Sequence, residues 1–175
     1  MIITGDRLLA LIQRDGIVSN PDSYDVNSIT LTLGREILRV ENEGQEHVYG
    51  QPIRPEWVKR LEVPEEGILL EPHSAFLAMS EESVSMPPGH LGLLQTKGSL
   101  ARLFITVSCC DAQIDPGYQG RITFEIVNLA GLRVRLLPGT AIAQLFIAEC
   151  TAKNGALYRG RYQGAQRPTI QAPEK

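Results

Sequence analysis

Hydrophobic and polar residues alternate in short runs along most of this chain. In Ser28–Leu33 every second residue is Ile or Leu, and the residues between them are Ser or Thr. A period of two predicts a strand with one buried face, which we expect to end at Gly34. Further strands are predicted at Glu36–Val40, Ile68–Glu71, Ala75–Ser80, Leu91–Gln95, Ile105–Ser108, Ile122–Asn128, Val134–Leu137 and Ala143–Glu149.

A helical period is present at only two places. Apolar residues three and four apart within 4–16 predict a helix that Thr4 caps and Gly16 ends. A second, very short helix is predicted within 98–103, with Ser99 as its cap. Turns rich in Gly and Pro separate the strands, and the chain holds 16 Gly and 11 Pro. This pattern predicts one all-β domain, a sandwich, barrel or jelly roll, with a short N-terminal helix and one short internal helix.

Composition favours a soluble protein of a reducing compartment. No run approaches the roughly 20 apolar residues that span a bilayer, so no membrane contact is expected. The first residues lack the basic start and apolar middle of a signal peptide. Cys109, Cys110 and Cys150 do not form a disulfide framework. We therefore expect reduced thiols and a cytoplasmic location.

The end of the chain is basic, whereas the chain as a whole has a net charge of -3. Residues 151–173 contain Lys153, Arg159, Arg161 and Arg167 and no acid. A basic segment on an acidic body predicts a compact anionic ligand rather than a nucleic-acid polymer, which would require a broad basic face. The alternative is a solvated tail that binds nothing.

The short internal helix is a second place where an anion can bind. The first turn of a helix has free N–H groups that favour phosphate, and Lys97 and Arg102 flank this one. The alternative is an ordinary helix that packs Leu100 and Leu103 into the core.

Glu125 is the acid that the strand pattern singles out. In Ile122–Asn128 it shares one face with Thr123 and Val127, so it has apolar neighbours along its own strand. A carboxylate in such surroundings is suited to exchanging a proton near neutral pH. The alternative is an ordinary acid on a solvated face.

Two other hydrolytic chemistries are not supported. Zinc-dependent deaminases need His-x-Glu and Pro-Cys-x-x-Cys, but no histidine here has Glu two residues later, and Cys109-Cys110 is not Cys-x-x-Cys. A serine or cysteine hydrolase would need a nucleophile elbow or a base near the nucleophile, and the sequence shows neither.

Five motifs in the second half of the chain share the order and spacing of a known family. They are KGSLARL at 97–103, IDPGYQG at 114–120, ITFEIVN at 122–128, PGTAIAQL at 138–145 and YRGRYQG at 158–164. Together with segments 27–34 and 70–87, they resemble the dCTP deaminase branch of the dUTPase-like superfamily. The resemblance covers nearly the whole chain.

This resemblance implies a distorted β-barrel or jelly roll of the dUTPase type, assembled as a homotrimer with active sites between subunits. It implies binding of dCTP or dUTP, and deamination of dCTP to dUTP and ammonia in pyrimidine deoxynucleotide metabolism. Glu125 would activate a water for attack on cytosine C4, with no metal at the reacting carbon. Mg²⁺ would accompany the triphosphate, without ligands from protein side chains.

The resemblance also implies roles for other positions in these motifs. Asp115 would contact the deoxyribose, and its place before Pro116-Gly117 also suits a turn. The barrel domain would span residues 1–157, and the tail 158–175 would close over the triphosphate of a neighbouring subunit. The remaining substrate-binding positions are Lys97, Ser99 and Arg102 for phosphate, Gln113, and Tyr158, Arg161, Tyr162 and Gln163 in the tail.

Four positions depart from the family pattern and leave other functions open. Gly98 replaces a serine that helps to hold the water and the leaving amine, and Gln113 replaces an arginine. Asp111 replaces a small residue near the base, and Thr30 replaces an aspartate. Loss of a hydrogen-bonding group at a reacting centre can cost orders of magnitude in rate. The alternatives are a dUTP diphosphatase, a bifunctional dCTP deaminase and dUTPase, and a non-catalytic nucleotide-binding regulator.

Overall fold

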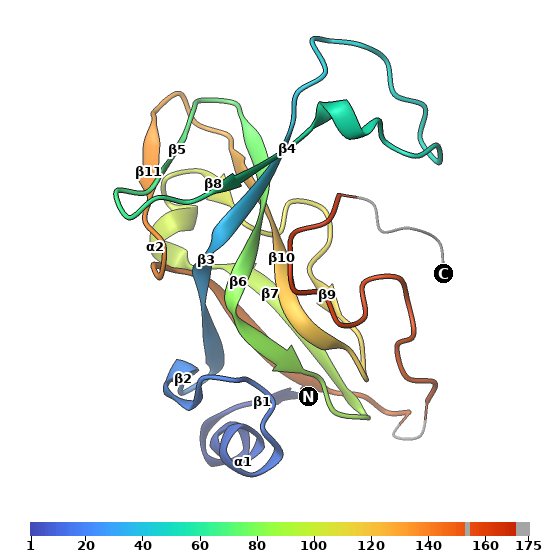
Figure 1. The fold of residues 1–175 in the computed structure, drawn as a ribbon. Helices are drawn as coiled ribbons and strands as arrows, with labels where there is room; N and C mark the ends of the chain where they lie inside the picture. The colour runs from blue at the N-terminus through green and yellow to red at the C-terminus, as the bar shows by residue number, and fades with distance from the viewer. Residues whose placement is uncertain (153–154, 171–175) are drawn as a thin grey trace.

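The computed structural model describes residues 1–152 and 155–170, so Lys153 and positions 171–175 of the predicted tail lie outside the described residues. Figure 1 shows a mostly β molecule in which long strands curl around one core, as the sequence pattern predicts. Its helical segments are α1 (Gly5–Asp15), α2 (Gly98–Ala101) and two 3₁₀ turns at Pro21–Ser23 and Pro55–Trp57. The strands are β1 (Ile2–Ile3), β2 (Tyr24–Asp25), β3 (Ser28–Val40), β4 (Val58–Glu62), β5 (Ile68–Leu70), β6 (Ala75–Ser85), β7 (His90–Thr96), β8 (Ile105–Thr106), β9 (Gln113–Ile114), β10 (Gln119–Asn128), β11 (Val134–Leu136) and β12 (Ala141–Glu149).

Antiparallel pairing joins most strands into one curled sheet. Its order is β8-β10-β6-β3-β12-β7-β9, with β1 added to β12 and both β2 and β4 added to β3. A separate two-stranded sheet pairs β11 with β5. Among the described residues, no helix is both long and apolar enough to cross a membrane.

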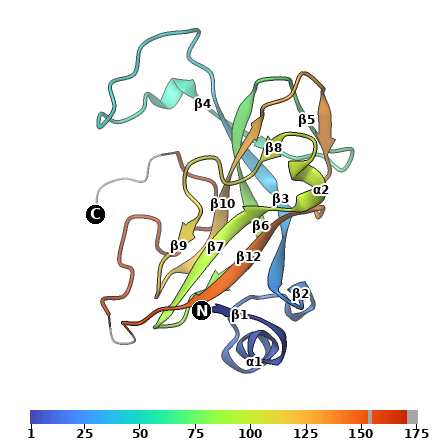
Figure 2. The same ribbon diagram turned by 180° about the vertical axis from the view of Figure 1, so that it is seen from behind.

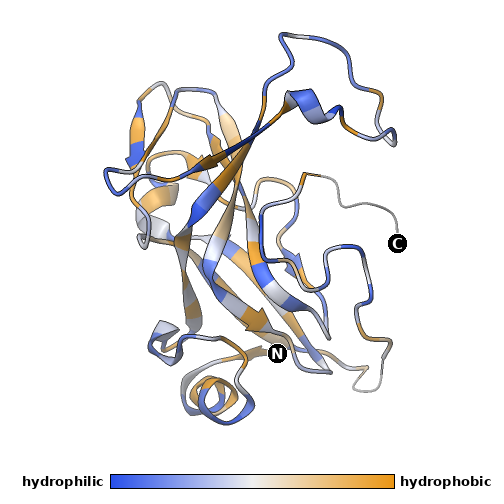
Figure 3. Ribbon diagram, viewed as in Figure 1, coloured by the Kyte–Doolittle hydropathy of each residue, from blue (hydrophilic) through white to orange (hydrophobic). Residues whose placement is uncertain are grey.

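The burial of β10 follows its sequence alternation. Ile122, Phe124 and Ile126 are buried in the core, whereas Thr123 and Glu125 are only partly buried. Figure 3 shows hydrophobic and hydrophilic segments interleaved along the long strands. The predicted strand face of Glu125 is therefore confirmed.

Gly34 does not end a strand, contrary to the sequence prediction. The predicted strands on either side of it are one continuous β3, and the register against β6 shifts between Leu33 and Ile37. A Cβ at Gly34 would lie 2.8 Å from the carbonyl oxygen of Met79. Glycine is therefore needed here because the backbones of β3 and β6 approach closely, and not because the chain turns.

The structure confirms the predicted end of the first helix but not the predicted cap of the second. Gly16 ends α1 in the left-handed conformation, and its N–H donates to the Leu11 carbonyl, as expected. Thr4 occupies the N-cap position of α1, but its side chain makes no capping hydrogen bond. The prediction for Ser99 is wrong: Lys97 is the N-cap residue of α2, and Ser99 lies inside the helix.

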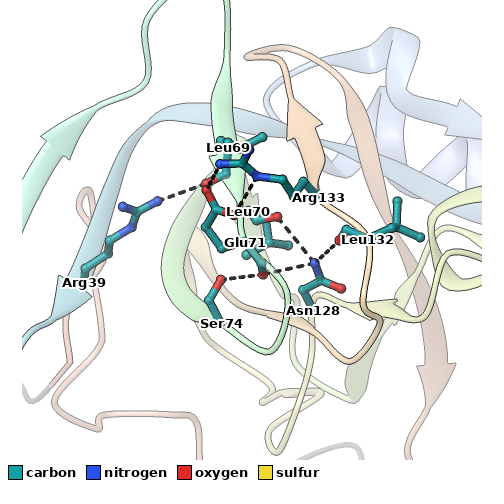
Figure 4. A network of polar contacts seen from close by, with 8 residues as sticks. All are labelled: Arg39, Leu69, Leu70, Glu71, Ser74, Asn128, Leu132 and Arg133. Carbon is teal, nitrogen blue, oxygen red and sulfur yellow. Dashed lines mark hydrogen bonds and ion pairs between the residues drawn. The ribbon is translucent and has the colours of Figure 1, made fainter. Parts of the chain in front are cut away.

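A polar network fixes the far end of β10 (Figure 4). The buried Asn128 side chain donates to the carbonyl oxygens of Leu132, Glu71 and Leu70 over 2.8, 3.0 and 3.4 Å. Arg133 forms a two-pronged ion pair with Glu71 beside it. Because a buried amide with several partners holds one geometry, this network sets the position of the strand that carries Glu125.

Candidate active site

The backbone of Glu125 is held from both sides. It pairs with Leu77 across β6, and its N–H donates to the carbonyl oxygen of Val107 over 2.9 Å. The side chain thus extends from the middle of a strand with neighbours on each edge, which restricts its position.

Two backbone amides bind the Glu125 carboxylate. The N–H of Cys110 donates to Oε2 over 2.7 Å, and the N–H of Asp111 donates to the same oxygen over 3.2 Å. The other oxygen, Oε1, accepts no hydrogen bond from any described residue. Hydrogen bonds from N–H groups stabilise the charged carboxylate, and Oε1 is left able to accept a proton from a bound molecule.

The carboxylate lies in the wall of a cavity of about 470 Å³. This volume is in the range of small-molecule binding sites. Strands β6, β7, β9 and β10 form one side of it, and the end of the chain forms the other (Figure 1). The polar wall is Asp111, Gln113, Asp115, Thr123 and Glu125; the apolar wall is Leu77, Leu94, Ile114 and Ile122; the remaining lining comes from Cys110, Tyr118, Tyr158, Tyr162, Thr169 and Ile170.

Asp115 begins a tight turn, as the sequence predicts. The Tyr118 N–H donates to its carbonyl oxygen over 3.1 Å, and Gly117 has a φ of 87°, which favours glycine. The Gln113 side-chain amide donates to Asp115 Oδ1 over 2.6 Å. The turn and Gln113 together direct the Asp115 carboxylate at the cavity.

Tyr118 forms the base of this turn. Its side chain is 8% exposed, its hydroxyl donates to the Arg121 carbonyl, and its ring centroid lies 5.8 Å from that of Tyr158. Burial, and to a smaller extent the neighbouring Tyr158, raises the pKa of Tyr118 well above its usual value. Tyr118 is thus mainly a packing residue that also borders the cavity.

The end of the chain lies against its own barrel. The Tyr158 N–H donates to the Pro116 carbonyl over 2.7 Å. The Gln163 side chain accepts from the Gln119 N–H and donates to the Gly117 carbonyl, over 3.1 and 3.0 Å. Tyr158 and Tyr162 therefore line the same cavity as Glu125 of their own chain, whereas the resemblance implies a neighbour's site.

The predicted phosphate-binding residues do not join this cavity within one chain. Lys97, Ser99 and Arg102 belong to α2 and its ends, and none of them is in the lining. In Figures 1 and 2, α2 lies on the side of the barrel away from the C-terminal segment. Arg161 is exposed and also outside the lining, and Gln163 uses its side chain to anchor the tail.

The charged side chains in the described lining of the cavity are all acidic. Its described lining contains three carboxylates, those of Asp111, Asp115 and Glu125, and neither Lys nor Arg. A triphosphate bound here needs cations that this part of one chain does not supply. This separation could not be predicted from the motifs, because a motif specifies residue types but not the side of the barrel on which they lie.

The role of Cys110 was not predicted from the sequence. Its contribution is the backbone N–H that binds Glu125, and every residue except proline has such a group. Only the conformation of the 107–112 connection brings it to the carboxylate. No side-chain signal could have revealed it.

Comparisons with known proteins identify the family of this chain. A family model described as dCTP deaminase-like matches residues 2–150. The chain is 32% identical over 157 residues to a protein of Streptomyces griseus named dCTP deaminase, dUMP-forming, covering 86% of this chain and 82% of the other. It is 34% identical over 148 residues to the dCTP deaminase of Natronomonas pharaonis, covering 81% of this chain and 76% of the other.

A solved structure shows the same fold. The 2'-deoxycytidine 5'-triphosphate deaminase of Agrobacterium tumefaciens superposes with a TM-score of 0.64, at 20% identity over 83% of this chain; the match spans 47% of that protein. Fold and cavity together define a curled β-barrel with three carboxylates in the wall of its cavity. The chain belongs to the dCTP deaminase-like family.

Proposed function

We propose that this protein is a hydrolase that deaminates dCTP to dUTP and ammonia. The observation that carries the proposal is the Glu125 carboxylate, bound at Oε2 by two amides and open at Oε1, in the wall of a cavity. The names of the relatives, dCTP deaminase, agree with it. The role of Glu125 as the general base is our proposal and goes beyond both the geometry and the names.

The reaction needs one proton acceptor that later acts as a donor. Glu125 takes a proton from a water as the water oxygen attacks cytosine C4, and then returns a proton as the C4–N bond breaks and ammonia leaves. The N–H groups of Cys110 and Asp111 keep the carboxylate in place through both steps. Asp115, held by Gln113, accepts a hydrogen bond from the sugar hydroxyl.

The phosphates would be bound by a second copy of the chain. The cavity has three carboxylates and no cation in its described lining, whereas α2 has Lys97 and Arg102 on another side of the barrel. Next to α2, Phe104 and Leu129 expose 68% and 62% of their surface, and such apolar area favours contact between subunits. We propose a homotrimer, for which light scattering should give close to three times 19.3 kDa.

Mg²⁺ and the tail complete the proposed complex. The described residues contain no group of three His, Cys, Asp or Glu side chains placed to hold a metal. Mg²⁺ would be bound by phosphate oxygens and waters, which it commonly retains, and would neutralise phosphate charge. Tyr158, Tyr162 and Arg161 of the segment 158–175 would lie beside the nucleotide, in a cytoplasmic enzyme with free thiols.

A second candidate is deamination joined to removal of diphosphate. The dUMP-forming relatives favour it by name. A non-catalytic nucleotide-binding regulator is the third reading. Gly98 and Gln113 are the positions that favour it.

One product analysis separates the three readings. The protein is incubated with Mg²⁺ and either dCTP or dUTP, and ammonia, diphosphate and the nucleotide product are measured separately. Ammonia and dUTP from dCTP support the proposal. Ammonia with diphosphate and dUMP supports the bifunctional enzyme, and binding of dCTP without either product contradicts catalysis.

A further inference from the structure

Two adjacent cysteines lie at the edge of the cavity, in the connection between β8 and β9. Cys109 and Cys110 are both exposed, and their Sγ atoms lie 3.6 Å apart. Cys110 also lines the cavity, and its N–H donates to Glu125. We propose that this pair is a redox modification site, where a low-molecular-weight disulfide converts the two thiols to a vicinal disulfide and so weakens the binding of Glu125.

The oxidation is a balanced exchange. The Cys110 thiolate attacks one sulfur of the small disulfide, breaks its S–S bond and releases one small thiol. The Cys109 sulfur then attacks Cys110 in the mixed disulfide, forms the protein S–S bond and releases the second small thiol. Two protein thiols are oxidised, the small disulfide is reduced, and the protons of the protein thiols end on the two small thiols.

The local chemistry suits this order of attack. The neighbouring Cys110 thiol, together with partial burial, raises the pKa of the Cys109 thiol. Because the thiolate is the nucleophile, Cys109 is suited to the second, intramolecular step, in which a partner sulfur lies next to it. Cys110 is exposed and lines the cavity, so a small disulfide can reach it.

Geometry links the disulfide to Glu125. The two sulfur atoms must move from 3.6 Å to about 2.05 Å apart, the length of an S–S bond. Consecutive Cα atoms lie about 3.8 Å apart, which is shorter than the roughly 4.4–6.8 Å usual for a disulfide, so the connecting peptide has to rotate. That peptide contains the Cys110 N–H, and its rotation breaks the 2.7 Å hydrogen bond to Oε2.

The same strain makes the modification reversible. Exposed or strained disulfides are reduced more easily than structural ones. The site would therefore respond to the thiol–disulfide balance around the protein. The effect of oxidation on ammonia release, unlike the oxidation itself, rests on the proposed function of Glu125.

The site is tested by thiol counting on the full chain after incubation with oxidised glutathione. Wild type should fall from three free thiols to one, with Cys109 and Cys110 joined within one peptide and no glutathione retained. Cys150→Ser is the matched control and should form the same disulfide, whereas Cys109→Ser should form none. An unchanged thiol count, or a lasting glutathione adduct on either cysteine, would overturn the site.

The link to Glu125 is tested by amide hydrogen exchange and by ammonia release. In the oxidised protein, amides of 109–112 should exchange about tenfold faster, because a hydrogen bond is lost. Ammonia release from dCTP should fall about tenfold or more in the oxidised protein and recover with dithiothreitol. Oxidised protein with unchanged exchange and activity contradicts the link. If reduced protein releases no ammonia, the proposed function fails, while thiol counting and exchange still decide the redox site.

Discussion

The side-chain amide of Gln113 donates to Oδ1 of Asp115 over 2.6 Å, at the wall of the cavity that contains Glu125. The backbone of Asp115 is fixed at the same time by the turn that the Tyr118 N–H closes. Gln113 therefore acts as a positioning residue, in a place where the family pattern has an arginine. It binds one oxygen of Asp115, and under the proposed function the other oxygen accepts the hydrogen bond of the sugar hydroxyl.

Gln113→Ala should weaken selection of the deoxyribose. Without the amide, Asp115 can rotate, so we expect KM for dCTP to rise about tenfold while kcat changes little. Steady-state kinetics with dCTP and CTP would measure both the KM change and a loss of discrimination between the sugars. Gln113→Glu places a second acid beside Asp115 and should be worse than alanine. Equal kinetics for wild type and Gln113→Ala would show that the hydrogen bond does not position Asp115 during turnover.

Gly98→Ser should raise the rate of deamination. A Cβ at Gly98 would meet no atom within 4 Å, so the added side chain fits without strain. A hydroxyl there would restore the group that the resemblance implies for holding the water and leaving amine, and we expect a gain of about tenfold or more in kcat. Gly98→Ala is the matched control, since it adds the Cβ without the hydroxyl. If serine and alanine give the same rate, this protein does not use a group at position 98.

Asn128→Ala should destabilise the whole barrel. The buried amide satisfies three carbonyl oxygens, and its Oδ1 accepts the Ala130 N–H over 3.0 Å. Removing it leaves buried polar groups unpaired, so the free energy of unfolding should fall by about 3 kcal/mol in urea denaturation. Ser74 in the same network is only partly buried and its side chain makes one hydrogen bond, so Ser74→Ala should cost less than about 1 kcal/mol. Similar losses for the two variants would mean that the network is not a buried anchor.

Tyr118 should make the protein less stable in alkali. Its folded-state pKa is raised by burial, so above the unfolded value of about 10 the unfolded chain loses its proton while the folded chain keeps it. The stabilisation from Tyr118 is thus complete below about pH 10 and declines as pH rises further. Urea denaturation from pH 8 to 11 should show a steeper decline for wild type than for Tyr118→Phe. Parallel curves for the two proteins would contradict the raised pKa.

Sequence reasoning succeeded where side-chain type and period decide the outcome. Alternation in 122–128 placed Glu125 on the half-exposed face of its strand, and Gly16 ended its helix. It failed where backbone geometry decides. The sequence predicts a strand end at Gly34, but this glycine permits the close approach of two strands. It predicts a helix cap at Ser99, but this residue lies inside α2.

The candidate site shows the same division. Asp115 and Glu125 in the cavity wall could be proposed as site residues from their side-chain types and motifs. The amides that bind Glu125 could not be predicted, because they belong to the backbone, which every residue has. The distance between α2 and the cavity depends on how the sheet curls, which local patterns do not encode.

Under the proposed function, Glu125 of one chain and the α2 cations of another form one deaminase site. This shared site is tested by mixing two variants, Glu125→Gln and Arg102→Ala, through reversible unfolding and reassembly, and measuring ammonia from dCTP. Each variant alone should be nearly inactive. Random mixing should restore about a quarter of the wild-type rate, because about one site in four then combines an intact Glu125 with an intact Arg102 from different chains. A mixture that stays as inactive as the two variants would contradict the shared site.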